Sequence, residues 1–182
     1  VSLAAHCGSN DGFVKTWYDQ SGSANDATQT NTASQPKIYD AATGVELTNA
    51  NPAVFFDGSD DNLVSPISTT QPLSVFVICE IRTYSSVNYL FGSGVVNTDN
   101  VFIGNNTSNN WRYFAGTNVN TSTTTPLAQT LMTGVFNGAS SALYGDSVLI
   151  DSSNVGTNGI NNLYVGSKND TTAGVNGTLQ AL

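Results

Sequence analysis

Short apolar runs recur every 8 to 14 residues along this chain, separated by clusters of Asn, Gly, Ser and Asp. Runs of about four to eight residues between turn formers are typical of β-strands, and helical spacing is almost absent. The pattern predicts an all-β sandwich or barrel. We expect strands at Gly12–Tyr18, Pro36–Tyr39, Ala53–Phe56, Leu63–Val64, Leu73–Arg82, Tyr89–Gly92, Val101–Gly104, Trp111–Ala115, Thr130–Phe136, Ser141–Tyr144, Ser147–Ile150 and Asn162–Val165.

The run Leu73–Arg82 is the most apolar of these. Its odd-numbered residues from Leu73 to Ile81 are all apolar, and its even-numbered residues include Phe76 and Ile78. We therefore expect a central strand with one face in the core and the other covered by loops or forming the floor of a groove. In contrast, TNVNTSTTT at Thr117–Thr125 has the composition of a polar loop, and we expect no regular structure there.

The composition limits the class of protein. The 182 residues (19.0 kDa) suffice for one domain spanning 1–182, and only 10% are charged, so Asn, Thr and Ser must keep the surface soluble. Such a surface suits an extracellular or virion-surface protein better than a cytosolic enzyme.

The charges argue against two kinds of partner. Thirteen acidic residues against five scattered basic ones give a net charge of -8, so nothing would neutralise a phosphate backbone or an anionic membrane. Nucleic acid is therefore not expected. No apolar run approaches the roughly 18 residues of a membrane span.

Both ends of the sequence suggest a fragment of a longer polypeptide. The chain begins at Val1 without Met, and its final segment, NGTLQAL, alternates like a strand, so we expect at least one more strand beyond Leu182. The chain has two cysteines, Cys7 and Cys79, and one interpretation is that they form a disulfide. The alternative is that Cys79, inside an apolar strand, acts as a small hydrophobic residue.

Several segments, taken in order, resemble the concanavalin A-like, laminin-G-like β-sandwich superfamily: GFVKTWYDQSGSANDATQ, QPKIYDA, NPAVFFDGSDDNL, LSVFVICEI, LMTGVFNGASSALYGDSVLI and LYVGSKND followed by NGTLQAL. The closest similarity is to the WYDQSG-bearing module that resembles the catalytic domain of fungal arabinofuranosidase B. The resemblance covers nearly the whole chain and implies an antiparallel two-sheet jelly roll whose last strand would follow Leu182. Lectins, hydrolases, adhesins and phage structural proteins share this sandwich, so the resemblance identifies a fold rather than an activity.

A glycosidase needs two carboxylates that flank the scissile bond. The chain has two Glu residues, Glu46 and Glu80, and CEIRTY around Glu80 lacks the E-x-D-x-E alternation of the glucanases in this superfamily. Glu80 with an unassigned Asp is a weak catalytic candidate; the alternative is a strand-end Glu paired with Arg82. The single histidine, His6, is a poor partner for Cys7, because adjacent side chains in an extended segment point apart.

One acidic cluster is a candidate metal site. Asp57, Asp60 and Asp61 in FDGSDDN are hard oxygen ligands that suit calcium, and calcium sites in related laminin-G-like domains support this reading. The alternative is a tight turn at Asp57-Gly58, with Asp60 and Asp61 facing water. No other cofactor is predicted.

Sugar binding needs flat aromatic faces with hydrogen-bonding groups beside them. Aromatic and amide side chains in or beside loop-flanked strands form the candidate ligand site: Trp111, Tyr113, Asn110, Tyr84 and Tyr89. Trp111 is the strongest of these candidates. The competing interpretation is a tryptophan that covers the edge of the core.

The segment TWYDQSG combines aromatic and polar residues at the end of a predicted strand. Successive side chains alternate, so one of the two aromatic residues can anchor the core while the other covers the rim of the sheet. The polar residues after them can satisfy the backbone of a turn that glycine permits. We interpret the motif as a structural corner made by Trp17, Tyr18, Asp19, Gln20, Ser21 and Gly22.

The leading hypothesis is a non-catalytic surface module for attachment or decoration, within a virion (phage tail, fibre or head) or another extracellular structural protein. Its partners would be cell-surface polysaccharide or neighbouring structural proteins in an oligomeric assembly. The alternatives are a carbohydrate-active enzyme of the arabinofuranosidase type and a purely structural assembly domain.

Overall fold

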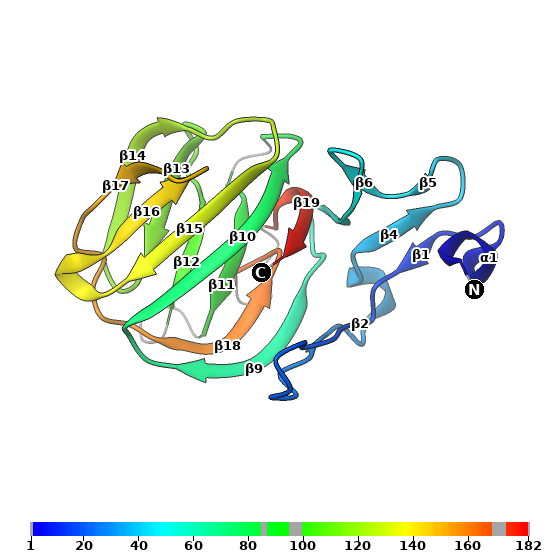
Figure 1. Cartoon of the computed structure of the whole chain (residues 1–182), viewed down its shortest axis with the longest axis horizontal. Coiled ribbons are helices and arrows are strands. Elements are labelled where there is room, and N and C mark those ends of the chain that lie inside the picture. Colours follow the sequence, from blue (N-terminus) through cyan, green and yellow to red (C-terminus); the bar gives the residue numbers. More distant parts are fainter. Residues whose placement is uncertain (1, 85–86, 95–99, 169–173, 182) are drawn as a thin grey trace.

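The computed structural model describes residues 2–84, 87–94, 100–168 and 174–181 (Figure 1). Apart from a short helix, α1 (Leu3–Cys7), and two 3₁₀ turns, its regular elements are strands. They are β1 (Gly12–Phe13), β2 (Thr16–Trp17), β3 (Ala27–Thr28), β4 (Lys37–Asp40), β5 (Gly44–Val45), β6 (Leu47–Thr48), β7 (Asn51–Pro52), β8 (Val54–Asp57), β9 (Leu63–Thr69), β10 (Leu73–Ile81), β11 (Tyr89–Ser93), β12 (Phe102–Asn105), β13 (Asn110–Phe114), β14 (Asn118–Thr124), β15 (Thr130–Phe136), β16 (Ala142–Gly145), β17 (Val148–Asp151), β18 (Ile160–Val165) and β19 (Asn176–Ala181).

Two antiparallel sheets form a sandwich, which confirms the predicted all-β class. The 9-stranded sheet, called sheet A, has the order β1-β4-β8-β19-β10-β15-β16-β17, with β5 attached to β4. The 8-stranded sheet, called sheet B, has the order β14-β13-β12-β11-β18-β9-β3-β2, and β6 pairs with β7 separately. In Figure 1 the strands β10, β15 and β16 lie in front of β11, β12 and β13, while α1, β1, β4 and β5 extend to one side.

The central strand β10 follows its predicted alternation. It pairs with β15 from Leu73↔Phe136 to Cys79↔Thr130, and with β19 on its other side. On its odd-numbered face Val77, Cys79 and Ile81 are at most 2% exposed, whereas Phe76 on the even-numbered face is 58% exposed. The odd-numbered face therefore packs in the core between the sheets, as predicted.

The predicted strand Gly12–Tyr18 is divided between the two sheets. β1 pairs with β4 in sheet A, and β2 pairs with β3 in sheet B. Val14, between them, donates its N–H to the carbonyl of Pro36, and its side chain packs against the core. Apolar and polar residues continue through the crossing, so the sequence pattern contains no signal for the change of sheet.

The segment Thr117–Thr125, predicted to be an irregular loop, contains the edge strand β14. β14 pairs with β13 through Tyr113↔Val119 and Arg112↔Asn120. An edge strand with one partner can consist almost wholly of polar residues, and its β-branched threonines favour extended backbone. The prediction of a loop was therefore wrong, because it used polarity and ignored the high β-propensity of threonine.

The predicted strand Leu63–Val64 is longer in the structure, where β9 reaches Thr69. The extension includes Pro66, although proline cannot donate a hydrogen bond to a ladder. The structure accommodates it where the register with β18 shifts between Asn161 and Leu163.

The cysteines are not bridged in the structure: Cys79 is buried in the core and Cys7 is half-buried, both as free thiols. Cys79 therefore acts as the small hydrophobic residue of the alternative prediction. Among the described residues, no helix has the length and apolar character that crossing a membrane requires.

Candidate functional site

The two aromatic residues of β13 that were candidates for sugar binding lie in the core. Trp111 is 2% exposed and Tyr113 is fully buried. The Tyr113 hydroxyl donates to Asp151 Oδ2 (2.7 Å) and accepts from the N–H of Ser153 (3.1 Å). Burial, together with the bond to Asp151, raises the pKa of Tyr113. Neither ring offers a face to a ligand. The burial of Trp111 fits the competing interpretation, a tryptophan that covers the core, and Tyr113 lies in the same core.

The other three candidates do not form one surface. Asn110 lies at the start of β13 and accepts a hydrogen bond from the Thr124 hydroxyl (3.3 Å). Tyr84 packs against the core and donates to the carbonyl of Thr125. Tyr89 accepts from Arg112, whose guanidinium carbon lies 4.9 Å from the centre of its ring. The ring of Tyr89 is thus already in contact with a cation.

The two Glu residues are paired with the same arginine. Arg82 lies 3.3 Å from Glu46 (Nη1 to Oε2) and 3.8 Å from Glu80 (Nε to Oε1). The guanidinium carbon also lies 5.2 Å from the centre of the Phe55 ring. Glu80 therefore lies near the end of its strand beside Arg82, the arrangement that the structural alternative describes. A glycosidase acid would instead need a carboxyl group with a raised pKa facing its partner across an open site.

The acidic cluster is compact. One carboxylate oxygen from each of Asp57, Asp60 and Asp61 lies within 4.8 Å of the others. Asp60 accepts from the Ser34 hydroxyl (2.7 Å), and Asp57 accepts from the N–H of Ser59 (2.8 Å), which makes the predicted tight turn. Calcium binding at this cluster stays a prediction.

Asp61 differs from its neighbours in burial. It is 7% exposed, so the alternative that placed it in water is wrong for this residue. Burial raises its pKa to about 7, and the nearby charges of Asp57 and Asp60 add to the effect. A hydrogen bond from the N–H of Asp57 to Asp61 Oδ2 (3.0 Å) acts in the opposite direction. Near neutral pH a proton would compete with any cation for this carboxylate.

The aromatic pair of the TWYDQSG motif divides as predicted. Trp17 is half-buried and packs against the core, while Tyr18 is 66% exposed. Gln20 donates to the carbonyl of Tyr18 (3.1 Å). The motif therefore presents a tyrosine at the surface directly after the chain has crossed between the sheets.

Asp19 organises the turn that follows. Its carboxylate accepts from the N–H groups of Ser21 (2.7 Å) and Asn25 (3.0 Å) and from the Ser21 hydroxyl (2.8 Å). The hydrogen bond from Asn25, followed by those from Ser21, lowers the pKa of Asp19. The N–H of Asp19 donates to Asp26 Oδ1 (2.8 Å), and Gly22 has a φ of 84°. These contacts agree with the predicted structural corner.

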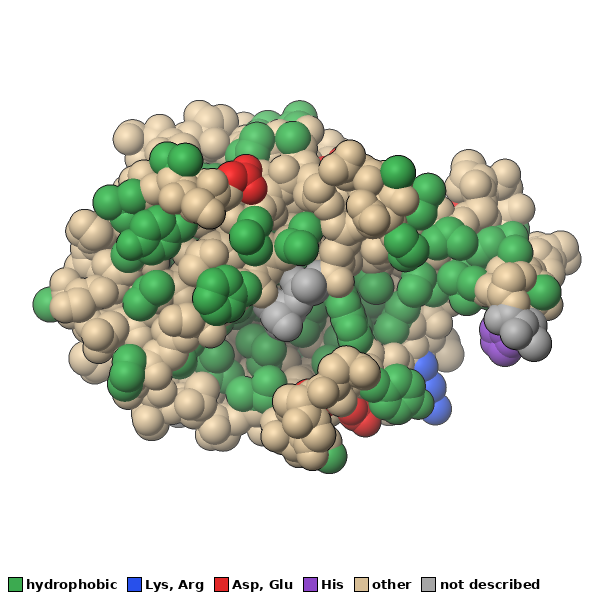
Figure 2. Space-filling model, in the orientation of Figure 1, with side chains coloured by type: hydrophobic (Ala, Val, Ile, Leu, Met, Phe, Trp, Pro, Cys, Tyr) green, Lys and Arg blue, Asp and Glu red, His purple; other side chains and the backbone are tan. Residues whose placement is uncertain are grey.

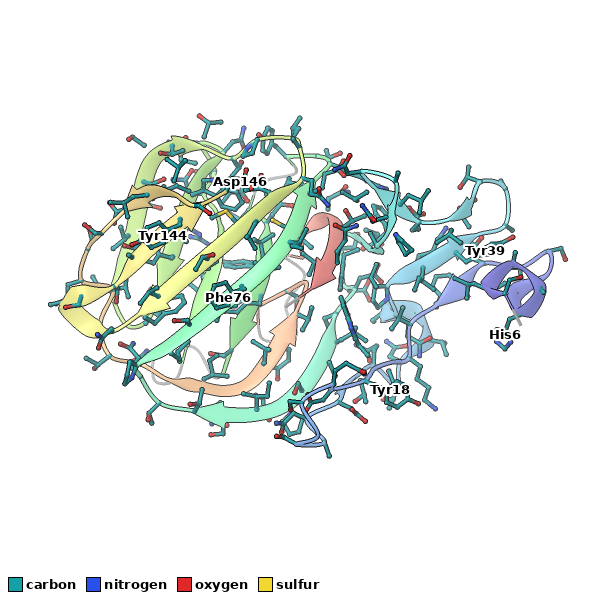
Figure 3. All side chains as sticks on the ribbon, viewed as in Figure 1. His6, Tyr18, Tyr39, Phe76, Tyr144 and Asp146 are labelled. Atoms are coloured by element: carbon teal, nitrogen blue, oxygen red, sulfur yellow. The ribbon has the colours of Figure 1, made fainter. Side chains whose placement is uncertain are left out.

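A row of side chains on the outer face of sheet A was missed by the sequence reasoning. The register aligns Phe76 with Thr133, Thr133 with Tyr144 and Tyr144 with Leu149, across β10, β15, β16 and β17. We call these four residues the aromatic row. Phe76 is 58% exposed and Leu149 54%, while Tyr144 is half-buried. Figure 3 shows Phe76 and Tyr144 on this face, with Asp146 near the end of β16.

The aromatic row combines apolar and polar groups. Figure 2 shows hydrophobic side chains standing apart from one another on this face, among polar atoms. Thr133 lies between the two aromatic residues, and Asp146 forms the β16–β17 turn, where it accepts from the N–H of Leu131 (2.9 Å). Such a mixture can stack on the apolar face of a sugar while hydroxyl and carboxylate groups accept its hydrogen bonds.

A groove of about 810 Å³ opens beside the corner, between the two sheets. Trp17 and Tyr18 form one side of it, and Leu73 of β10 and Ile67 of β9 contribute to its apolar walls. The rest of the lining mixes polar groups such as Asn25 with further apolar ones, and these include Phe76, which therefore borders both the groove and the aromatic row.

Three solved structures with a similar fold are of the sialidase from Trypanosoma rangeli. The complex with sialic acid matches 93% of this chain and 28% of the sialidase, with a TM-score of 0.61 and 14% identity. The complex with the inhibitor DANA matches 98% of this chain and 32% of the sialidase, with a TM-score of 0.53 and 12% identity. The covalent intermediate with 2,3-difluorosialic acid matches 75% of this chain and 26% of the sialidase, with a TM-score of 0.55 and 13% identity.

This structural similarity is evidence for a shared fold alone. This chain spans less than a third of the sialidase to which it is compared, and their identity is at most 14%. No family model and no curated protein matches the sequence.

Proposed function

We propose that residues 1–182 form a non-catalytic glycan-binding domain that serves attachment or decoration. The observation that carries this proposal is the aromatic row, in which Phe76 and Tyr144 lie on the same outer face with Thr133 between them. The two aromatic residues are two strands apart, about 10 Å in a regular sheet. A short oligosaccharide can lie across both rings while the threonine hydroxyl meets its hydroxyl groups.

Two further observations support a glycan as the ligand. The solved structures with a similar fold belong to a sialidase, whose complexes hold sialic acid and its analogues. The ordered motifs resemble the arabinofuranosidase B-like module of the concanavalin A-like superfamily, whose jelly-roll members include lectins. Both point to a fold used by glycan-related proteins, and the choice of sugar is left to experiment.

The enzyme alternative has less support than the binding module. Glu46 and Glu80 are both paired with Arg82, and the Asp19 carboxylate is used in a turn. A retaining or inverting glycosidase needs one protonated and one ionised carboxyl group on either side of a bound sugar. The contacts of these three acids serve structure instead.

A protein partner is the second candidate for the same face. Leu149, at the end of the aromatic row, is 54% exposed, and an aliphatic side chain exposed to this degree also suits an assembly contact. We propose that the protein is displayed outside the cell or on a virion, within an oligomeric assembly. The low content of charged residues, 10%, supports such a surface location.

A glycan array followed by calorimetry tests the glycan proposal. The array should include sialylated, arabinose-containing and bacterial cell-wall glycans. We expect a hit whose affinity falls about tenfold, or ~1.4 kcal/mol, in Phe76→Ala and in Tyr144→Ala. Val148→Ser is the matched control: Val148 is exposed and apolar, but it alternates with Leu149 on β17, so its side chain leaves the sheet on the side opposite the aromatic row and the variant should bind as the wild type does.

A different outcome selects the assembly candidate. If no glycan binds, and if Leu149→Asp converts an oligomer to monomers in sedimentation velocity, the face is a protein contact. If Glu80→Gln abolishes hydrolysis of an aryl arabinofuranoside by the wild type, the domain is an enzyme and the proposal is wrong.

A further inference from the structure

Two cationic side chains meet over aromatic rings on the outer face of sheet B. Tyr113 of β13 is buried in the core, so its neighbour Arg112 points to the opposite side. The guanidinium carbon of Arg112 lies 4.9 Å from the centres of both the Tyr89 and the Phe102 rings. Lys168 Nζ lies 5.6 Å and 5.1 Å from the centres of the same two rings. We call Arg112 and Lys168 the cation pair.

Two glycines allow the cation pair to form. The register aligns Tyr89, Gly104 and Arg112 across β11, β12 and β13, which lie behind sheet A in Figure 1. Because Gly104 has no side chain, the guanidinium can lie over β12 and donate from Nη2 to the Tyr89 hydroxyl. On β11, a Cβ at Gly92 would lie 2.8 Å from the Cα of Lys168, so glycine allows the chain after β18 to pass this close.

The charges around Arg112 differ from those around the other half-buried cations. Lys37 lies 2.8 Å from Asp11 and 3.0 Å from Asp40, and Arg82 is likewise placed between two carboxylates. Within the described part of the chain, no carboxylate pairs with Arg112. The charged group that shares its aromatic rings is a second cation instead, in a chain whose net charge is -8. Charge complementarity therefore favours an anion as the ligand of this face.

Arg112 also has unused hydrogen-bond donors. A guanidinium carries several N–H groups, and in the described structure Nη2 donates to Tyr89 while Nε is buried without a partner. Burial and, after it, the charge of Arg112 lower the pKa of Lys168. An anion between the two cations would offset their repulsion and the partial loss of their hydration. A carboxylate suits this position because it can accept two hydrogen bonds from one guanidinium.

The surroundings of the cation pair suit a sugar that carries the carboxylate. The Phe114 ring is half-buried and stacks on Phe102, with ring centres 5.2 Å apart and an interplanar angle of 2°. On β14, Asn118 lies opposite Phe114, and Asn120 lies opposite Arg112. Both asparagines are exposed. Amide side chains can donate to and accept from sugar hydroxyls, and an aromatic ring can cover the apolar side of a sugar.

We propose that the cation pair binds the carboxylate of an acidic saccharide on the outer face of sheet B. The carboxylate lies between Arg112 and Lys168, and the sugar ring extends toward Phe114 and Asn120. The aromatic row lies on the outer face of the other sheet. This inference therefore goes beyond the glycan proposal and does not depend on it.

Calorimetry with the trimer of galacturonic acid tests the site. The methyl ester of this trimer has the same rings without the charges and should not bind measurably. We expect Lys168→Gln and Arg112→Gln each to weaken binding of the acidic trimer about tenfold, the loss of one charge-assisted contact. Lys15→Gln is the matched control, because it removes an exposed cation elsewhere and should bind as the wild type does. Phe76→Ala, which tests the aromatic row, should also bind the trimer normally.

A titration of the wild type avoids any effect of the substitutions on folding. Arg112→Gln also removes the stacking on two rings, so the variant alone would not separate binding from stability. In ¹⁵N-labelled protein, the Arg112 Nε–H and the Lys168 amide signals should shift when the acidic trimer is added. They should stay in place when the ester is added.

Several outcomes would overturn the proposal. Equal binding of the trimer and its ester would do so, as would unchanged affinity in Lys168→Gln or an equal loss in Lys15→Gln. If the trimer does not bind, the assignment to a saccharide is wrong; binding of a hexaglutamate peptide or of inorganic phosphate would then identify the anion that the pair recognises. If Phe76→Ala loses the trimer and Lys168→Gln does not, the acidic sugar binds at the aromatic row instead.

Discussion

Replacing Trp111 with alanine distinguishes a structural role of this residue in the core from a role in ligand binding. Trp111 is 2% exposed, so the substitution removes an indole that contributes about 150–250 Å² of buried surface. At about 25 cal/mol per Å² this corresponds to roughly 4–6 kcal/mol, an upper estimate because unfolded chains already bury part of that surface. We expect a loss of about 4 kcal/mol in the free energy of unfolding, within the range of about 3–5 kcal/mol for Trp→Ala in cores.

Urea unfolding followed by far-ultraviolet circular dichroism measures this loss. Trp111→Phe keeps most of the apolar volume and should lose much less stability than the alanine variant. At a urea concentration where both variants are folded, neither should lose affinity for a glycan that binds the wild type. A Trp111→Ala protein that loses less than about 1 kcal/mol but no longer binds the glycan would refute the reasoning and restore Trp111 as a sugar platform.

Two further substitutions test the buried polar groups. The pKa of Asp61 is raised to about 7 from 3.8, so its contribution to stability is fully present below about pH 4 and is lost as pH rises to 7. After allowance for partial solvent access, Asp61→Asn should stabilise the fold by about 2 kcal/mol at pH 8 in urea unfolding, and Asp60→Asn should not. Tyr113→Phe removes the hydrogen bonds to Asp151 and from Ser153, and should cost about 1.5–3 kcal/mol; an unchanged melting temperature would contradict this.

The alternation in the sequence predicts which residues share a face, but it does not predict which face is inside. In β13, Trp111 and Tyr113 alternate with Asn110 and Arg112, and either pair would suit a half-buried strand. The large aromatic residues next to asparagines gave two open interpretations, a sugar platform and core. Only the packing of sheet B against sheet A shows that Trp111 and Tyr113 face the core. In β10 the choice was easier because its odd-numbered residues are all apolar, whereas polar residues interrupt the even-numbered face.

The aromatic row could not be predicted because it depends on register. Phe76, Thr133 and Tyr144 belong to three strands, and they align only when β10 pairs with β15 and β15 with β16. The short separations between the predicted strands Thr130–Phe136, Ser141–Tyr144 and Ser147–Ile150 favour β15, β16 and β17 as neighbours. Nothing local indicated that β10 pairs beside them, because that contact joins residues about fifty to sixty positions apart and is made by non-local packing.

The most direct test of the glycan proposal is a nuclear magnetic resonance titration with the strongest hit from the array. In ¹⁵N- and methyl-labelled protein, the largest chemical-shift changes should map to Phe76, Thr133 and Tyr144, and they should disappear in Tyr144→Ala. If the largest changes map to the groove beside Tyr18, or if the changes persist in Tyr144→Ala, the outer face of sheet A is not the glycan site.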